Sequence, residues 1–157
     1  MTMKKTVLSL LLGVILMPIS AFSQTDTTET IRSKGYVIRP EFYGAVLAEV
    51  GYQVNPHVQV SLGGGFEIAE NIAVPELVAG LRMYATDTKW TAFFDYHLGL
   101  LMVGNMALVS HRVTAGPSYK NLDVGGGVIY AEIERVGTWG LCLTLGYNIR
   151  IPSKSGK

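Results

Sequence analysis

The sequence predicts an all-β chain that folds as a single antiparallel up-and-down β-barrel of about eight strands, of the transmembrane type. Three observations predict this fold: strict alternation of large apolar with small or polar residues, turn-forming pairs at short intervals, and an apolar N-terminal run typical of exported proteins. Successive side chains of a strand point to opposite faces, so the alternation gives each strand one apolar face. In a membrane barrel this face meets lipid.

The clearest alternation lies near the C-terminus, over residues 138–151. The large residues of this stretch are Trp139, Leu141, Leu143, Leu145, Tyr147, Ile149 and Ile151. The residues between them are Thr138, Gly140, Cys142, Thr144, Gly146, Asn148 and Arg150. A strand with this pattern has a continuous hydrocarbon face with aromatic residues towards its ends, as expected for a strand that crosses a bilayer.

The first 23 residues have the organisation of a secretory signal peptide. Lys4 and Lys5 precede the apolar run 7–17, and Ala21 and Ser23 supply the small residues expected just before cleavage. The alternative is a retained anchor, but a membrane-spanning helix needs roughly 20 apolar residues. We therefore expect an exported protein with a signal peptide (1–23), a flexible polar leader (24–34), a β-barrel domain (35–152) and a polar tail (153–157).

Composition supports a membrane location and excludes several classes of protein. Charged residues make up 16% of the chain and apolar residues 48%, whereas soluble domains have roughly 25% charged residues. The net charge of +1 gives no basic footprint for nucleic acid. Cys142 is the single cysteine, so an internal disulfide is excluded and the hydrogen-bonded barrel must hold the domain together.

Turn signals divide the chain into strands. They occur at Asn55-Pro56, Glu70-Asn71, residues 86–89, Gly104-Asn105, Lys120-Asn121 and Val136-Gly137. The stretch 36–54 is too long for one ordinary strand, and Pro40 within it cannot donate a ladder hydrogen bond. A break near Gly44 gives eight strands, whereas a single bent strand would give seven.

Alternation assigns a face to most side chains. It is regular in residues 57–68, 74–85 and 90–102 and weaker in 106–119 and 122–133. Because buried charges must pair, we expect a lumenal polar cluster that fills the interior and leaves no wide pore. Its candidate members are Glu49, Glu76, Arg82, Asp95, His97 and Arg112. The candidate lipid-interface aromatics are Trp90, Trp139 and Tyr147.

The sequence resembles the small outer-membrane β-barrel proteins, the group that contains OmpX and the membrane domain of OmpA. The resemblance spans about residues 35–151. It rests on Gly51-Tyr52-Gln53-Val54-Asn55-Pro56, on Lys89-Trp90 followed by Phe93-Phe94-Asp95-Tyr96-His97-Leu98-Gly99, and on Leu145-Gly146-Tyr147-Asn148-Ile149. It implies a membrane barrel and says nothing of activity. Proteins of this group usually finish on an aromatic residue, whereas this chain continues past Ile151.

Residues suited to catalysis or metal binding do not form a recognisable motif. The glycine runs 63–65 and 125–127 lack the Lys-Ser/Thr of a phosphate loop and fit bends or close packing in strands. Asp95 and His97 share a strand face but have no nucleophile elbow nearby. His57, His97 and His111 lack metal-ligand spacing, which predicts lumenal or turn histidines. We expect no catalytic residue, no metal and no cofactor.

The predicted function is that of a non-enzymatic integral barrel of the bacterial outer membrane, with a structural, membrane-maintenance or interaction role. Its expected partners are outer-membrane lipids and the barrel-assembly and periplasmic chaperone machinery. One alternative is a soluble periplasmic or secreted lipocalin-like barrel around an apolar ligand, with the faces inverted. A less favoured alternative is a lipid-modifying enzyme that uses Asp95 and His97. A proton or small-ion leak through the lumen is a further variant.

Overall fold

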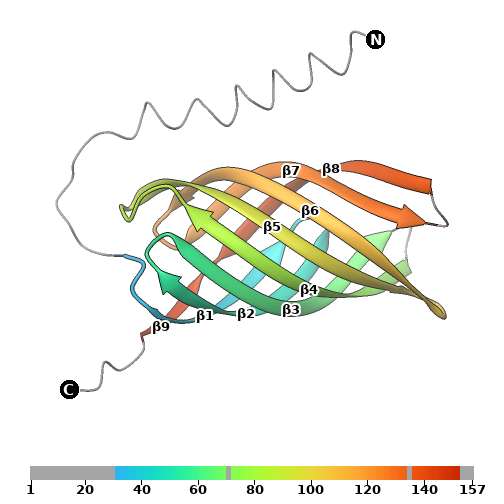
Figure 1. Cartoon of the computed structure of the whole chain (residues 1–157), viewed down its shortest axis with the longest axis horizontal. Helices are drawn as coiled ribbons and strands as arrows, with labels where there is room; N and C mark the ends of the chain where they lie inside the picture. The colour runs from blue at the N-terminus through green and yellow to red at the C-terminus, as the bar shows by residue number, and fades with distance from the viewer. Residues whose placement is uncertain (1–30, 70–71, 134–135, 153–157) are drawn as a thin grey trace, which may run out of the picture.

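The computed structural model describes residues 31–69, 72–133 and 136–152, and these residues form an antiparallel β-barrel (Figure 1). The strands are β1 (Gly35–Phe42), β2 (Ala45–Asn55), β3 (Val58–Ala69), β4 (Ile72–Tyr84), β5 (Trp90–Val103), β6 (Met106–Tyr119), β7 (Leu122–Ile133), β8 (Val136–Tyr147) and β9 (Ile149–Pro152). None of the described residues belongs to a helix long and apolar enough to cross a bilayer. The signal peptide and polar tail expected from the sequence lie outside the described residues, as does most of the leader.

Each strand from β1 to β8 pairs with its neighbours in sequence. β8 and β9 both pair with β1, so the sheet closes on itself. β1 pairs with β2 along its whole length and with both β8 and β9 on its other side. The all-β, up-and-down barrel predicted from the sequence is therefore confirmed. We call the end that contains Gly35 and Pro152 the proximal end, and the end that contains the β1–β2 turn the distal end.

The ring has eight members because β9 is the continuation of β8. The pairing of β1 with β8 and the pairing of β1 with β9 have the same register. Between them, only Tyr147 and Asn148 have no partner in β1. These two residues lie opposite Arg39 and Pro40. Proline has no N–H to donate, so the ladder is interrupted there without a change of direction. The predicted break near Gly44 is also present, since β1 ends at Phe42 and Gly44 has a φ of 96° that suits glycine in a tight turn.

One predicted turn is wrong. Val136 and Gly137 belong to β8, where they pair with Ile133 and Glu132 of β7. The glycine is needed for packing rather than for a turn, because a Cβ at this position would lie 2.5 Å from the ring of Tyr130. The connection between β7 and β8 falls instead on residues 134–135, which lie outside the described residues.

The β1–β2 hairpin is shorter than the strands beside it. β7 pairs with β8 all the way to Val136, whereas β1 pairs with β8 only at Gly146 and Leu145. Within the described chain, residues 136–144 of β8 thus have a strand on one side only. The outward side chains there are the most open of the wall, with Leu141 90% and Leu143 81% exposed.

The two faces of the wall are inverted relative to a soluble barrel. The inner face is buried and mostly polar. Its buried charged residues include Arg39, Glu41, Glu49, Glu76, Arg82, Asp95, His97, Arg112 and Asp123. The outer face is exposed and apolar on every strand of the ring, from Tyr36 and Ile38 on β1 to Leu143 and Leu145 on β8. A soluble protein buries its large apolar residues instead.

Arg32 closes the proximal mouth of the barrel and is fully buried. Its Nη1 donates to the carbonyls of Thr86 and Thr88, its Nη2 donates to the Ser118 hydroxyl, and its guanidinium lies 4.2 Å from the centre of the Tyr84 ring. Burial lowers the pKa of this guanidinium from its ordinary value. Although the sequence places this residue in a flexible leader, here it links the β4–β5 loop to β6.

Replacing Arg32 with Ala should lower the free energy of unfolding by roughly 1–3 kcal/mol, because buried carbonyls and a hydroxyl lose a charged donor. The measurement is urea unfolding of the protein refolded in vesicles. Its exposed neighbour offers a matched control, since Ser33→Ala should leave the midpoint unchanged. Equal midpoints for the two variants would show that the Arg32 contacts do not contribute to stability.

Candidate functional site in the barrel interior

The centre of the lumen is occupied by two arginines set among three carboxylates. Arg82 contacts Asp95 directly and its Nη1 lies 3.1 Å from Asp123 Oδ2. Arg39 Nη2 lies 3.2 Å from Glu41 Oε2, and Arg39 Nη1 lies 3.6 Å from Asp95 Oδ2. These side chains come from β1, β4, β5 and β7. The Arg82–Asp123 and Arg39–Asp95 pairs cross the lumen and join strands that are not neighbours in the wall.

A second group of charges lies next to the first and centres on His97. Arg112 Nη2 donates to His97 Nδ1 at 2.6 Å and also lies 3.1 Å from Glu41 Oε1. Because arginine only donates, His97 Nδ1 is the acceptor of this hydrogen bond. His97 Nε2 then faces Glu49 Oε1 at 2.9 Å, and the Ser61 hydroxyl donates to the other oxygen of Glu49 at 2.8 Å.

The distal part of the lumen combines one carboxylate with apolar packing. Glu76 accepts hydrogen bonds from the Tyr43 hydroxyl and from Ser110 Oγ. The Arg112 guanidinium lies 3.5 Å from the centre of the Tyr43 ring. Tyr43 also belongs to a buried apolar cluster with Ala45, Leu47 and Val78. Side chains thus fill the lumen from the Arg32 mouth to the β1–β2 turn.

Glycines on the inner face make room for the long lumenal side chains. A Cβ at Gly146 would collide with the Arg39 guanidinium. A Cβ at Gly80 would lie 2.6 Å from His97 Nε2, and a Cβ at Gly63 would lie 2.7 Å from Glu49 Cγ. The glycines that alternate with large residues in the sequence therefore leave space in the lumen for charged side chains.

The structure places all six predicted cluster residues on the inner face, where each is at most 6% exposed. It also brings them together with three charged residues that the sequence analysis missed, namely Arg39, Glu41 and Asp123. In β1, Arg39 and Glu41 alternate with the apolar residues Ile38 and Phe42. Once the chain is divided at Gly44, this alternation places both charges on the inner face. Asp123 lies on β7, where alternation is weak and gives little guidance.

One of the three histidines, His111, lies elsewhere than predicted. His57 is in the turn between β2 and β3, as one of the two expected locations allows. His111 is neither lumenal nor in a turn. It lies on the outer face of β6, where its Nδ1 is 2.8 Å from the Tyr96 hydroxyl and its ring is 6.2 Å from that of Tyr130. The hydrogen bond to Tyr96 and the neighbouring aromatic rings give the polar imidazole of His111 partners on an otherwise apolar face.

The lumen brings three potential metal ligands together, Glu41, Glu49 and His97. Sequence spacing gives no sign of them because they come from three strands. The Arg112 guanidinium already contacts both Glu41 and His97, so these groups have a cation in place. A metal ion would have to enter beside this fixed charge, and the donor set therefore fits an internal ion pair better than a metal.

The predicted interface aromatics point outward at the two ends of the wall. Trp90 and Tyr147 lie at the proximal end, and the Trp90 ring lies 4.5 Å from that of Tyr119. Trp139 lies towards the distal end, and its ring is 4.7 Å from that of Tyr130. The outer wall thus has aromatic pairs near both ends.

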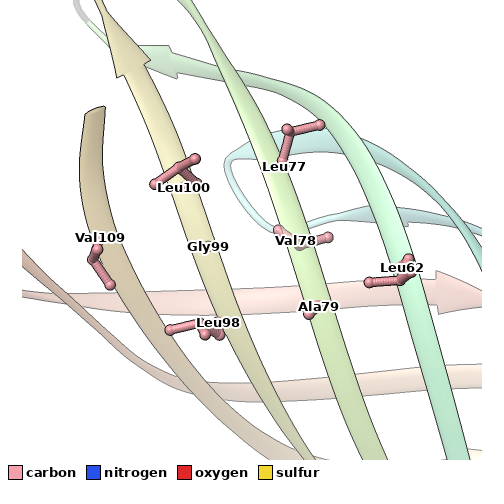
Figure 2. Close-up of a pocket in the computed structure, with 8 residues that line it drawn as sticks. All are labelled: Leu62, Leu77, Val78, Ala79, Leu98, Gly99, Leu100 and Val109. Atoms are coloured by element: carbon pink, nitrogen blue, oxygen red, sulfur yellow. The ribbon is translucent and has the colours of Figure 1, made fainter. Parts of the chain in front are cut away.

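An apolar groove of about 280 Å³ crosses the outer wall over β3 to β6 (Figure 2). It exists because Ala79 lies between two larger residues in adjacent strands, Leu62 and Leu98. Leu77, Leu100 and Val109 complete its outward lining. The groove opens on the outside of the barrel, and its lining contains none of the residues of the lumenal ion pairs.

Comparison with known proteins gives one informative result. The chain resembles the N-terminal β-barrel domain of OprF from Pseudomonas aeruginosa, with a TM-score of 0.51 and 14% sequence identity. The match covers 75% of this chain and 98% of the OprF domain. At this identity the likeness concerns the fold. No family model and no curated protein matches the chain.

Replacing Arg82 with Met should lower the free energy of unfolding by about 3–5 kcal/mol, because Asp95 and Asp123 would keep buried charges without their main partner. The measurement is again urea unfolding in vesicles. The double variant Arg82→Met with Asp95→Asn should recover part of the loss, since one orphaned charge is removed with its partner. A single variant as stable as the parent would show that the ion pairs do not hold the interior together.

Proposed function

We propose that the protein is a non-enzymatic integral β-barrel of the bacterial outer membrane whose lumen is closed by its own side chains. The observation that carries the proposal is the inversion of the faces: charged residues such as Arg82 and Asp95 are buried inside, while leucines and aromatics cover the outside. In water such a surface would associate or aggregate, whereas in a bilayer it is the surface that lipid requires. The fold likeness to the OprF barrel domain supports the same location.

The filled interior supports a structural or membrane-maintenance role rather than transport. Arg32 fills one mouth, the ion pairs fill the centre, and Tyr43 with its apolar neighbours fills the other end. An eight-stranded barrel is just wide enough for such filling. The connections between strands are short, the longest in the described chain being residues 85–89, which gives a protein partner little loop surface to recognise. Lipids and the barrel-assembly and chaperone machinery are the partners we propose.

The soluble lipocalin-like alternative requires the opposite arrangement. It needs the apolar set inside and Glu76, Arg82 and Asp95 in water, but these three side chains are buried. The enzyme alternative requires a nucleophile activated by a base. His97 contacts Arg112 and Glu49, and the Ser110 hydroxyl donates to Glu76 rather than to a histidine. These contacts support the non-enzymatic proposal.

The proposal predicts heat-modifiable migration from the outer-membrane fraction of the native host. The folded barrel should be extracted only with detergent and should migrate differently on a gel before and after boiling, because its closed hydrogen-bonded ring resists the detergent until heated. An Arg82→Met sample should lose the shift at a lower temperature than the parent. A freely soluble periplasmic protein with no shift would overturn the proposal.

A further inference from the structure

Four exposed residues at the proximal end form a compact patch, which we call the rim patch: Lys89, Trp90, Tyr119 and Lys120. Trp90 and Tyr119 are paired across β5 and β6, with ring centroids 4.5 Å apart. The two lysines follow directly on the water side of this pair. The backbone N–H of Lys120 donates to the carbonyl of Lys89 at 2.7 Å, and Lys120 Nζ lies 5.5 Å from the centre of the Tyr119 ring.

The order of these residues along the barrel is that of a membrane interface. The apolar wall ends in the aromatic pair, and amphipathic rings prefer the headgroup level of a bilayer. The lysines lie in the connections beyond the strands, one residue further from the apolar band. Their ammonium groups therefore reach the plane of the lipid phosphates if the wall is inserted.

Among the residues that the structure describes, the exposed charges at the two ends of the barrel differ in sign. At the proximal end, the exposed charged side chains in the described chain are Lys34, Lys89 and Lys120. The carboxylate of Asp87 lies in the same region, but it is partly buried and accepts a hydrogen bond from the backbone of Arg32. At the distal end, the described residues include the exposed Glu132 and the half-buried Glu67. With lysines at one end and glutamates at the other, the two ends of an inserted barrel would interact differently with leaflets of different charge.

We propose that the rim patch binds the headgroups of anionic phospholipids, and that the proximal end consequently faces the leaflet rich in them. This inference rests on the proposed function, since it needs an inserted barrel. Each lysine near an anionic surface strengthens its attraction, and the attraction is screened by salt. The apolar aromatic pair directly below the lysines favours a lipid over a free phosphate, because a lipid occupies both parts of the patch at once.

The two tryptophans of the chain allow a direct test. Trp139→Phe leaves Trp90 as the single tryptophan at the rim patch, and Trp90→Phe leaves Trp139 at the distal end. Each full mature chain is refolded in vesicles that contain a small fraction of brominated phosphatidylglycerol or brominated phosphatidylcholine. Quenching of tryptophan fluorescence measures how often each lipid occupies the site next to the reporter.

At low salt, Trp90 should be quenched with an apparent association constant at least about threefold higher for phosphatidylglycerol than for phosphatidylcholine. The preference should vanish in Lys89→Gln with Lys120→Gln and should shrink in high salt, while Trp139 should show no preference. Heat-modifiable migration checks that the double variant is folded. Equal quenching of Trp90 by both lipids, or a preference that survives the double substitution, would overturn the inference while leaving insertion intact. Absence of quenching for both reporters would overturn insertion itself.

Discussion

Mutual neutralisation of the lumenal charges is the interaction on which the rest of the structure depends. An isolated ion is costly to bury, so Arg39 and Arg82 are tolerated in the interior because Glu41, Asp95 and Asp123 surround them. Two of the pairs, Arg39–Asp95 and Arg82–Asp123, connect strands that are not neighbours in the ring. The wall needs glycines where the long side chains turn, as at Gly146 beside Arg39. With charge on the inside, the apolar half of each strand is left for the outside.

Closure of the ring is the second constraint, and it depends on a small number of residue pairs between β1 and the last two strands. β1 contains Pro40, which interrupts the hydrogen-bond ladder between β1 and the last strand. β1 also ends at Phe42, so it does not extend along the first half of β8. In hydrocarbon, unpaired backbone groups are costly. The pairing of β9 with β1 at the proximal end therefore carries much of the closure. Arg32 adds to it there by joining the β4–β5 loop and β6 from inside.

The sequence was sufficient for the fold because alternation is strict where the wall is regular. Along β8 and β5 it places each side chain on a face, and Pro40 with Gly44 indicates where the first hairpin turns. It failed where a residue's role depends on another strand. Gly137 looks like a turn residue, yet it is needed beneath the ring of Tyr130. The meeting of Glu41, Glu49 and His97, and the burial of Arg32, depend on register between strands, which one sequence does not encode locally.

The central claim, a charged interior inside a lipid-facing wall, is tested most directly along β8. Single cysteines are introduced at each position from 140 to 145 in a Cys142→Ser background, with position 142 tested in the parent, and labelled with an environment-sensitive fluorophore in vesicles. The account predicts a period of two: labels at 141, 143 and 145 should be quenched by lipid-borne quenchers, and those at 140, 142 and 144 should not. Uniform quenching, or quenching of the even positions only, would contradict it.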